Sequence, residues 1–440
     1  MLTLEDYLQQ NARLYPDKTA VVCGAETCSY LQLYERCRAR ATDFASDKGR
    51  IHLFRASPSI DFVVDYMALH MAGAIATPLE RDTPQLLLDE MAAKLPSPTD
   101  PIADVLFTTG TTGHSKGVII SHRTIIANAE NLIAGQGFTN DLTFIVNGPL
   151  NHLGSLSKLY PVIVLGATLY IIDSMKDLSL FFDALDYNAP KMATFFVPAT
   201  VRMLLQLAPQ RLASYAHKLD FIECGGAPLP HADMVALCRL LPTMRLYNTY
   251  ASTETGIVTT YNYNDGRYMA GCVGRPLPHS TVFITPDGRI ACQGNTLMSG
   301  YLGAPELTEA ILRDGTVYTA DLGRMDDEGM LHISGRQDDV INIGGYKVAP
   351  TEVEDAALLL PDVEDCICIA VAHPITGLAL KLLVVMAAGR LLDKRLLAQH
   401  LARRLERYKV PMLYEQATHI ERTYNGKLNR KFYKESQEQG

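Results

Sequence analysis

Short apolar runs of strand length alternate with segments of helical periodicity through the first half of the chain, and this alternation is the feature that most constrains the fold. The run from Lys191 to Phe196 precedes a helical pattern over Pro198 to Leu207. The run from Leu219 to Cys224 likewise precedes a helical pattern over Pro230 to Leu241. Asp61 to Thr77 has the spacing of a helix, a turn and a short buried strand. Such alternation predicts α/β layers built around largely parallel sheets.

The pattern changes twice toward the C-terminus. Beyond about residue 268 the chain has short strands separated by Gly and Pro turns, which predicts a small β subdomain over about 268–335. From Val353 onward the pattern is helix, strand, strand, helix, with a basic finish. At 440 residues the chain is too long for one ordinary core. We therefore predict an α/β fold: a large N-terminal domain of layered α/β sheets plus the β subdomain, residues 1–337, and a small α+β C-terminal domain, residues 338–440.

Charge and hydropathy narrow the classes of function. The formal net charge is −8, and no long run of like charge interrupts the chain, so nucleic-acid binding has no electrostatic footprint. The longest uncharged apolar stretch, Leu159 to Ile172, has 14 residues. That is short of the roughly 20 that span a bilayer, and Pro161 and Gly166 within it favour a helix, a turn and a buried strand. The N-terminus is acidic where a signal peptide would be basic. These features predict a cytoplasmic protein without a membrane span.

Cysteines and basic residues add two weaker indications. Cys366 and Cys368 are the only close pair among nine cysteines, and their spacing lacks the two-residue loop of zinc or redox sites. We expect buried, reduced thiols in a cytosolic protein. Between Arg403 and Lys434, nine Lys or Arg stand against three Glu. This excess is either a solvated face or a surface that approaches phosphates, and both interpretations stay open.

A loop rich in hydroxyls and glycines follows a predicted buried strand, Asp104 to Thr108. Its glycines let the backbone turn tightly with N–H groups pointing inward, and its hydroxyls and one ammonium add donors, which suits a polyphosphate. A Walker A loop has Gly before the Lys and Ser or Thr after it; here Ser115 precedes Lys116 and Gly117 follows, so this is a different phosphate loop. The alternative is a flexible hairpin of turn-forming residues. The candidate phosphate ligands are Thr108, Thr109, Gly110, Thr111, Thr112, Gly113 and Lys116.

This loop and the motifs that follow it resemble, in order and almost to the C-terminus, those of the adenylate-forming superfamily. That superfamily contains acyl-CoA synthetases, firefly-luciferase-like enzymes and peptide-synthetase adenylation domains. The resemblance implies a C-terminal domain that moves against the larger one. It also implies ATP, Mg²⁺ and coenzyme A as cofactors and co-substrates, with a small carboxylic acid as substrate.

Two motifs near the middle of the chain resemble the family's nucleotide site. In Glu223 to Leu229, the resemblance places Gly225, Gly226 and Ala227 along the adenine and the acyl pocket; a plain tight turn is the alternative. Within Tyr247 to Gly256 it assigns nucleotide contacts to Asn248, Tyr250, Ala251, Ser252, Thr253 and Glu254. Tyr250 would flank the base, Thr253 would meet the α-phosphate and Glu254 would hold Mg²⁺, for which one carboxylate with phosphate oxygens and water is sufficient. The family usually has Gly in place of Ala251, so a positive φ there would strain the turn.

Further motifs extend the resemblance toward the C-terminus. Asp321 matches the residue that binds the ribose hydroxyls, with an Asp in a β-turn as the alternative, and Arg336 matches one that contacts ribose and phosphate. Asp338 falls at the hinge. The stretch with Gly344, Gly345 and Tyr346 resembles the lining of the pantetheine tunnel. Lys427 matches the catalytic lysine, whose ammonium would offset repulsion between the carboxylate and the α-phosphate.

The acid itself is less constrained by the sequence. His152 resembles the residue that gates the family's acyl pocket, and a merely buried histidine is the alternative. Amino-acid-activating relatives usually have an Asp soon after this gate, whereas here no acidic residue lies between His152 and Asp173. An aryl or aliphatic acid without an α-amine is therefore favoured. The phosphate loop begins early for the family, so the first subdomain is expected to be short, and Asp82 to Pro101 is expected to have little regular structure.

The resulting hypothesis is an ATP-dependent acid–thiol ligase of the acyl-CoA synthetase type. It would form an acyl-adenylate and transfer the acyl group to coenzyme A, with Lys427, His152 and Glu254 as the candidate catalytic residues. One alternative is an adenylating enzyme that passes the acid to an acyl-carrier protein. Another is a non-catalytic nucleotide-binding protein, for which loss of Lys427, Glu254 or Arg336 would be expected; all three are present. A homodimer is compatible with the sequence.

Overall fold

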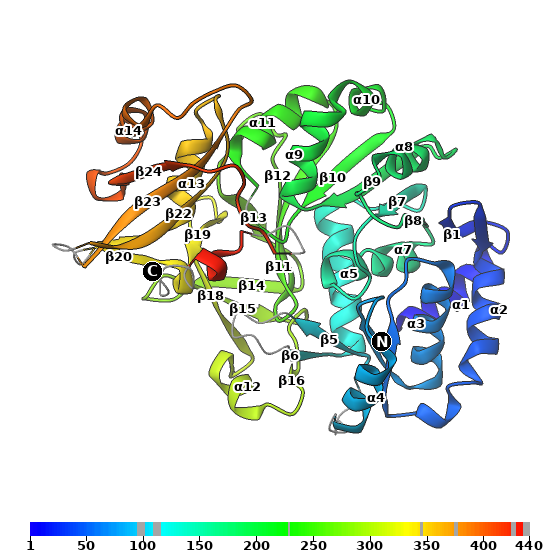
Figure 1. Ribbon diagram of the computed structural model, residues 1–440. Helices are drawn as coiled ribbons and strands as arrows, with labels where there is room; N and C mark the ends of the chain where they lie inside the picture. The colour runs from blue at the N-terminus through cyan, green and yellow to red at the C-terminus, as the bar shows by residue number, and fades with distance from the viewer. Residues whose placement is uncertain are drawn as a thin grey trace.

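The computed structural model describes residues 1–94, 102–108, 116–227, 229–343, 346–373, 377–423 and 428–433. Over these residues the chain forms a large N-terminal part built on two sheets and a smaller C-terminal part with short sheets of its own (Figure 1). The smaller part, yellow to red in Figure 1, lies on the opposite side of the molecule from the blue N-terminal helices. The predicted α/β class with a small C-terminal α/β unit is confirmed.

The larger sheet has a parallel centre. From β1 to β11 each neighbouring pair along the order β1-β8-β7-β9-β10-β11 is parallel, and β2 closes one edge antiparallel to β1. These strands are β1 (Thr19–Cys23), β2 (Glu26–Ser29), β7 (Leu142–Val146), β8 (Thr168–Ile171), β9 (Lys191–Phe196), β10 (Leu219–Cys224) and β11 (Arg245–Ser252).

Helices cover both faces of this parallel centre, which explains its nearly continuous apolar strands. Neighbouring strand residues point to opposite faces: Phe144 and Phe221 belong to one apolar cluster, and Ile145 and Ile222 belong to another. The first cluster contains side chains of α1 (Leu4–Leu14), α2 (Tyr30–Ala41), α3 (Ile60–Ala72), α5 (His122–Gln136), α6 (Leu153–Leu156) and α7 (Leu159–Leu165). The second contains side chains of α8 (Leu178–Asp186), α9 (Pro198–Leu207), α10 (Pro209–Ser214) and α11 (His231–Leu240).

The same sheet continues as antiparallel strands beyond β11. The order runs β11-β12-β13-β19-β18-β15-β14, and β17 pairs with β18 off this path. These elements are β12 (Gly256–Asn262), β13 (Cys272–Pro276), β14 (Ser280–Ile284), β15 (Arg289–Gly294), α12 (Pro305–Ile311), β17 (Leu312–Arg313), β18 (Thr316–Met325) and β19 (Leu331–Arg336). The motif from Asn248 to Glu254, at the end of β11, thus lies where the parallel and antiparallel regions of one sheet meet.

A second sheet has the order β16-β6-β5-β4-β3. It consists of β3 (Ile51–Arg55), β4 (Ile75–Leu79), β5 (Asp104–Thr108), β6 (Lys116–Ile120) and β16 (Gly300–Tyr301), the last being contributed from far along the chain. The short turn η1 (Ala45–Asp47) precedes β3. β16 comes from the chain segment that follows the antiparallel strand β15, so its pairing with β6 joins that segment to the predicted phosphate loop region.

The C-terminal part has its own apolar core. Its elements are η2 (Gln337–Asp339), β20 (Ile341–Ile343), β21 (Tyr346–Val348), α13 (Pro350–Leu358), β22 (Val363–His373), β23 (Gly377–Met386), α14 (Lys394–Ala402), η3 (Arg407–Lys409) and β24 (Leu413–Gln416). β22 and β23 are antiparallel, and β24 runs parallel to β23. Val353 of α13 and Leu397 of α14 are buried against one face of this sheet together with Leu382.

Most predicted elements have the expected bounds. The strand Lys191–Phe196 with the helix Pro198–Leu207 and the strand Leu219–Cys224 are confirmed, and the apolar stretch from Leu159 forms α7, a turn at Gly166 and β8. The expectation of little regular structure between Asp82 and Pro101 is wrong, because α4 occupies Gln85–Lys94. That segment consists mostly of strong helix formers, and its Leu88 is buried.

The cysteines and the helices agree with two further expectations. Cys366 and Cys368 are free thiols on the buried face of β22, and burial raises the pKa of both well above its ordinary value. Within the described ranges, no helix combines the length and the apolar character that crossing a membrane requires.

Candidate active site

The hairpin of β5 and β6 holds both ends of the predicted phosphate loop. Thr108 faces Lys116 across the antiparallel pair, so residues 109–115 connect two paired ends. The candidates Thr109, Gly110, Thr111, Thr112 and Gly113 lie outside the described residues. At Gly117 an added Cβ would come within 2.9 Å of Val105 Cγ1, so the close packing behind Lys116 requires glycine.

Lys116 and Glu254 are brought to the same place by Tyr301. The Tyr301 hydroxyl donates to Glu254 Oε1 at 2.9 Å, and Lys116 Nζ lies 5.2 Å from the centre of the Tyr301 ring. β16 carries Tyr301 into position by pairing beside β6, where Tyr301 faces Val118. Burial and the neighbouring Glu254 raise the pKa of Tyr301, which keeps the hydroxyl as a donor. Sequence analysis missed Tyr301, because nothing in its local motif indicates its contact with Glu254.

A self-bonded turn presents Thr253 and Glu254. Ser252 Oγ lies 2.9 Å from Thr255 Oγ1, and each of these two hydroxyls also accepts from the backbone N–H of the other residue. Gly256 closes the turn at φ +65°, where a Cβ would meet Thr296 O at 2.5 Å. Thr253 and Glu254 are half-buried at the tip, so the turn fixes both while leaving them partly accessible.

Three of the nucleotide candidates form a second group. The Tyr250 hydroxyl donates to Asp321 Oδ2 at 2.7 Å, and Arg336 Nε lies 3.5 Å from Asp321 Oδ1. Asp321 of β18 faces Arg336 of β19 in the ladder, which explains their proximity. Burial and the Asp321 carboxylate raise the pKa of Tyr250 well above its usual value, so the hydroxyl stays protonated and orients Asp321.

Two other candidates in this motif, Asn248 and Ala251, belong to strand β11. Ala251 lies in β11 at a register shift, and the non-glycine residues with a left-handed backbone among those described are Tyr268 and Asp314. The strain expected at Ala251 is therefore absent, because the position does not adopt positive φ. Asn248 Nδ2 donates to the carbonyl of Cys272 at 2.8 Å, which ties β11 to the start of β13.

The glycine turn after β10 lies against an aromatic ring. A Cβ on Gly225 would come within 3.3 Å of both the Phe195 ring and the carbonyl of Thr249, and Gly226 adopts φ +80°. A Cβ on Gly154 would meet the same ring at 3.2 Å. Phe195 therefore packs closely against two backbone segments from the predicted acyl and adenine regions, where a side chain in place of either glycine would crowd the ring. Ala227 is half-buried at the end of the turn.

A fully buried ion pair lies at the end of β10, next to this turn. Lys158 Nζ and Glu223 Oε2 are 2.7 Å apart, and both side chains are 1% exposed. Burial lowers the pKa of Lys158, and the adjacent Glu223 opposes that shift. The ammonium also lies 5.2 Å from the centre of the Phe195 ring. Sequence analysis missed the pair, although a Glu at the end of an apolar strand, two residues before Gly225, is an unusual position that could have indicated a buried partner.

His152 has an acidic neighbour that comes from another sheet. His152 Nε2 lies 3.2 Å from Glu80 Oε1, and Asn151 Nδ2 donates to the same oxygen at 3.0 Å. Glu80 directly follows β4, so the contact joins the second sheet to the start of α6. His152 is partly exposed, with 27% of its side chain accessible. The alternative of a merely buried histidine does not describe this position.

The C-terminal candidates are only partly described. Asp338 is exposed in η2, directly after β19, and Gly335 before it adopts φ +148°. Tyr346 is 58% exposed and stacks on Tyr408 at 4.7 Å. Gly344, Gly345 and Lys427 lie outside the described residues, so their predicted roles stay predictions.

An ion-pair network joins the base of the Lys427 segment to the N-terminal part. Arg422 Nη2 lies 2.8 Å from both carboxylate oxygens of Asp365, and Arg202 Nη1 lies 3.2 Å from Asp365 Oδ1. Arg202 of α9 is also paired with Asp233 of α11 at 3.0 Å. Arg422 forms an isolated β-bridge with Leu428, so the two ends of segment 423–427 are held together beside α9.

Comparison with known proteins assigns the fold and the motifs to one family. The model of the AMP-binding enzyme matches residues 84–302, and the model of the AMP-binding enzyme C-terminal domain matches residues 352–427. The chain belongs to the AMP-binding enzyme family. These are adenylate-forming ligases, so the resemblance inferred from the motifs is confirmed.

Two relatives of this AMP-binding enzyme are named as a CoA synthase and a CoA ligase. A feruloyl-CoA synthase of Amycolatopsis sp is 28% identical over 439 residues, covering 96% of this chain and 86% of that protein. A long-chain-fatty-acid–CoA ligase of Bacillus subtilis (strain 168) is 30% identical over 349 residues, covering 76% of this chain and 61% of that protein. The crystal structure of ATP-bound MatB from Rhodopseudomonas palustris has the same fold, with a TM-score of 0.86, 23% identity and 99% coverage of both chains.

The buried ion pair generates a stability prediction. We expect Lys158→Met to lower the free energy of unfolding by about 3–5 kcal/mol, because Glu223 is left as an uncompensated buried charge. The double variant Lys158→Met/Glu223→Leu is expected to lose less, since no charge then remains buried. Urea unfolding of the three proteins checks this, with Lys191→Met, which removes a half-exposed lysine paired with Asp141, as the control. A double variant less stable than Lys158→Met would contradict the interpretation.

Proposed function

We propose that this protein activates a carboxylic acid with ATP and transfers the resulting acyl group to the thiol of coenzyme A. The observation that carries the proposal is the convergence of Lys116, Tyr301 and Glu254 at the mouth of the phosphate hairpin. A cation and a carboxylate placed together beside a hydroxyl-rich loop suit a nucleotide triphosphate and its metal ion. Membership of the AMP-binding family and the CoA-ligase relatives support the same reaction class.

The described residues fit the groups that such a reaction requires. Tyr301 donates to Glu254 Oε1, which leaves the other carboxylate oxygen of Glu254 for Mg²⁺, and that ion would neutralise phosphate charge. Asp321 is held by Tyr250 and lies beside Arg336, so a carboxylate for the ribose hydroxyls and a guanidinium for phosphate stand next to each other. Lys116 would bind a phosphate of ATP.

The first half-reaction joins two anions. A carboxylate oxygen of the acid attacks the α-phosphorus of ATP, the bond to the bridging oxygen breaks, and pyrophosphate leaves with the electron pair. Lys427 would lie between the carboxylate and the α-phosphate, where its ammonium offsets their repulsion and stabilises the developing charge. The product is a mixed anhydride, which is a far better electrophile than the carboxylate.

The second half-reaction is acyl transfer. The thiol sulfur of coenzyme A attacks the carbonyl carbon of the anhydride, AMP leaves as the anion, and the thiol proton passes to solvent or to a base. We propose that rotation about Asp338 removes Lys427 after adenylation and brings the segment with Gly344, Gly345 and Tyr346 to the site. The exposed position of Asp338 in a short turn between the two parts of the chain supports this hinge. An acyl-carrier protein as acceptor is the alternative.

The surroundings of His152 bear on the class of acid. The described carboxylate beside His152 is Glu80, whose Oε1 accepts from Asn151, and the chain has no acidic residue between His152 and Asp173 that would pair an α-ammonium. Phe195 between Gly154 and Gly225 supplies an aromatic surface next to the same region. We therefore propose an aryl or aliphatic acid without an α-amine as the substrate.

The proposed catalytic lysine is tested by separating the two half-reactions. We expect Lys427→Ala to lower ATP–pyrophosphate exchange by about 100-fold or more, because charge stabilisation at the reacting phosphate is lost. The same variant should still convert a presynthesised acyl-adenylate and coenzyme A to the thioester. Lys394→Ala on the exposed side of α14 is the control and should match the wild type. Equal exchange by Lys427→Ala and the wild type would remove this residue from the mechanism.

The ion-pair network around Asp365 generates a prediction in which adenylation is impaired more than thioester formation. We expect Asp365→Asn to reduce adenylation about tenfold, because Arg202 and Arg422 then face each other without the carboxylate that orients the base of the Lys427 segment. Thioester formation from a presynthesised adenylate should change less than twofold. Glu364→Gln, the exposed neighbour on β22, is the matched control. An equal loss in both half-reactions would indicate general destabilisation and contradict the positioning role.

The substrate class is tested with a panel of acids. Aryl and aliphatic acids without an α-amine are expected to support pyrophosphate exchange, and α-amino acids are expected not to, because the chain has no acidic residue between His152 and Asp173 to pair their ammonium. The best acid is then incubated with ATP, Mg²⁺ and coenzyme A as the sole acceptor. Thioester formation supports the proposed ligase, whereas adenylation without transfer to coenzyme A favours a carrier protein.

A further inference from the structure

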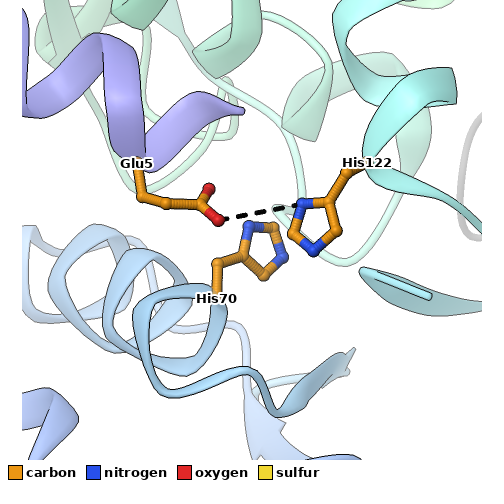
Figure 2. A group of neighbouring side chains, drawn as sticks. All are labelled: Glu5, His70 and His122. Atoms are coloured by element: carbon orange, nitrogen blue, oxygen red, sulfur yellow. Dashed lines mark ion pairs between the residues drawn. The ribbon is translucent and has the colours of Figure 1, made fainter. Parts of the chain in front are cut away.

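A cluster of three possible metal ligands lies in the first subdomain, built from three different helices. Glu5 is the second residue of α1, His70 lies near the end of α3 and His122 is the first residue of α5 (Figure 2). Their ligand atoms all lie within 4.8 Å of one another, and Glu5 Oε1 is 4.0 Å from His122 Nδ1. The two imidazole rings meet edge to face at 5.1 Å. Three helices thus present a carboxylate and two imidazoles to one point.

His70 is fixed by a buried carboxylate. Its side chain is fully buried, and its Nε2 lies 2.8 Å from Asp104 Oδ1. The Tyr66 hydroxyl donates to the other oxygen of Asp104 at 2.8 Å. Because a carboxylate only accepts, Nε2 of His70 carries the proton in this hydrogen bond, and its Nδ1 is left with a lone pair. A carboxylate that orients a histidine in this way is the usual outer partner of a metal-bound imidazole.

Two buried acceptor atoms of the cluster have no partner. Among the residues described, neither His70 Nδ1 nor Glu5 Oε2 makes a hydrogen bond, although both atoms are inaccessible to solvent. In Figure 2 the His70 ring turns its Nδ1 toward the Glu5 carboxylate. Buried polar atoms are nearly always satisfied, so an unpartnered imidazole nitrogen beside a carboxylate indicates a missing cation or proton between the two groups.

We propose that Glu5, His70 and His122 bind a divalent transition-metal ion of the zinc class, with water as a fourth ligand. Two imidazole nitrogens and one carboxylate form a donor set that suits such an ion and is poor for Mg²⁺, which prefers oxygen ligands. Ligand atoms at about 2.0–2.1 Å from zinc lie roughly 3.3 Å apart, so distances within the cluster must shorten by up to about 1.5 Å. His70 is fixed, whereas Glu5 and His122 have 18% and 27% of their side chains exposed and can move toward it.

The ion would connect the N-terminal helix to the nucleotide hairpin. His122 is separated from β6 by Ser121, and Asp104 begins β5, so both strands that border the phosphate loop lead to this cluster. Glu5 is far from these residues in the sequence and comes from α1. The bound ion therefore holds α1 and α3 against the base of the hairpin, a structural role separate from the Mg²⁺ proposed at Glu254.

The test is metal binding by the full chain, independent of catalysis. Protein freed of metal with a chelator is titrated with Zn²⁺ against a chromophoric competitor and with Co²⁺ by visible absorption. We expect one tight site in the wild type, tetrahedral Co²⁺ bands, and a rise in the melting temperature on adding Zn²⁺. Glu5→Gln and His122→Ala should each weaken Zn²⁺ binding by about 100-fold or more, since losing a ligand costs at least as much as losing its outer partner.

His279→Ala is the matched control. His279 forms a comparable surface pair with Glu130 at 2.6 Å outside the cluster, so its loss should leave the Zn²⁺ affinity unchanged. Glu5→Gln is nearly isosteric at a partly exposed position, which keeps the test informative if His122→Ala folds poorly. No saturable Zn²⁺ binding by the wild type, or equal affinity in wild type, Glu5→Gln and His279→Ala, would overturn the proposal and leave a proton shared by His70 and Glu5 as the explanation.

Discussion

The pairing of β16 with β6 is the constraint on which the candidate active site depends. It places Tyr301 beside the strand that carries Lys116 and thereby lets its hydroxyl donate to Glu254. The phosphate hairpin and the β11–β12 turn belong to separate sheets, and Tyr301 of this two-residue strand links Lys116 of the first to Glu254 of the second. A short ladder with few hydrogen bonds is thus sufficient to bring a cation and a carboxylate from distant motifs together, because both sheets are already fixed by their helices.

The larger sheet positions the candidate residues of the glycine turn and of the β11–β12 turn. Its parallel strands are covered on both faces, and at their carboxyl ends the chain turns through Gly225 and Gly226 and through the segment that presents Glu254. This agrees with the general position of ligand sites in α/β sheets. The ion pair of Lys158 and Glu223 lies directly beneath the glycine turn, where a buried charge needs a matched partner and so holds the two segments in one arrangement.

The sequence predicted local structure well and contacts between distant motifs poorly. The strand and helix at Lys191–Phe196 and Pro198–Leu207 follow from hydrophobic period and from Pro at the helix start, which are properties of neighbouring residues. α4 was missed because a polar-flanked segment after Pro84 resembles a connection, although its composition favours a helix. The roles of Tyr301, Glu80 and Lys158 had no local signal, since each depends on a partner far along the chain.

By itself, the sequence determined the order of strands and helices along the chain, the glycines in the turns and the types of side chain available in each motif. These follow from backbone sterics and from periodic burial, which act over a few residues. Only the tertiary structure decided that Tyr250 orients Asp321, that Arg202 meets Asp365 across the two parts of the chain, and that Glu5, His70 and His122 converge. Such contacts arise from how sheets and helices pack. The sequence near either residue does not indicate that the two are close in space until that packing is known.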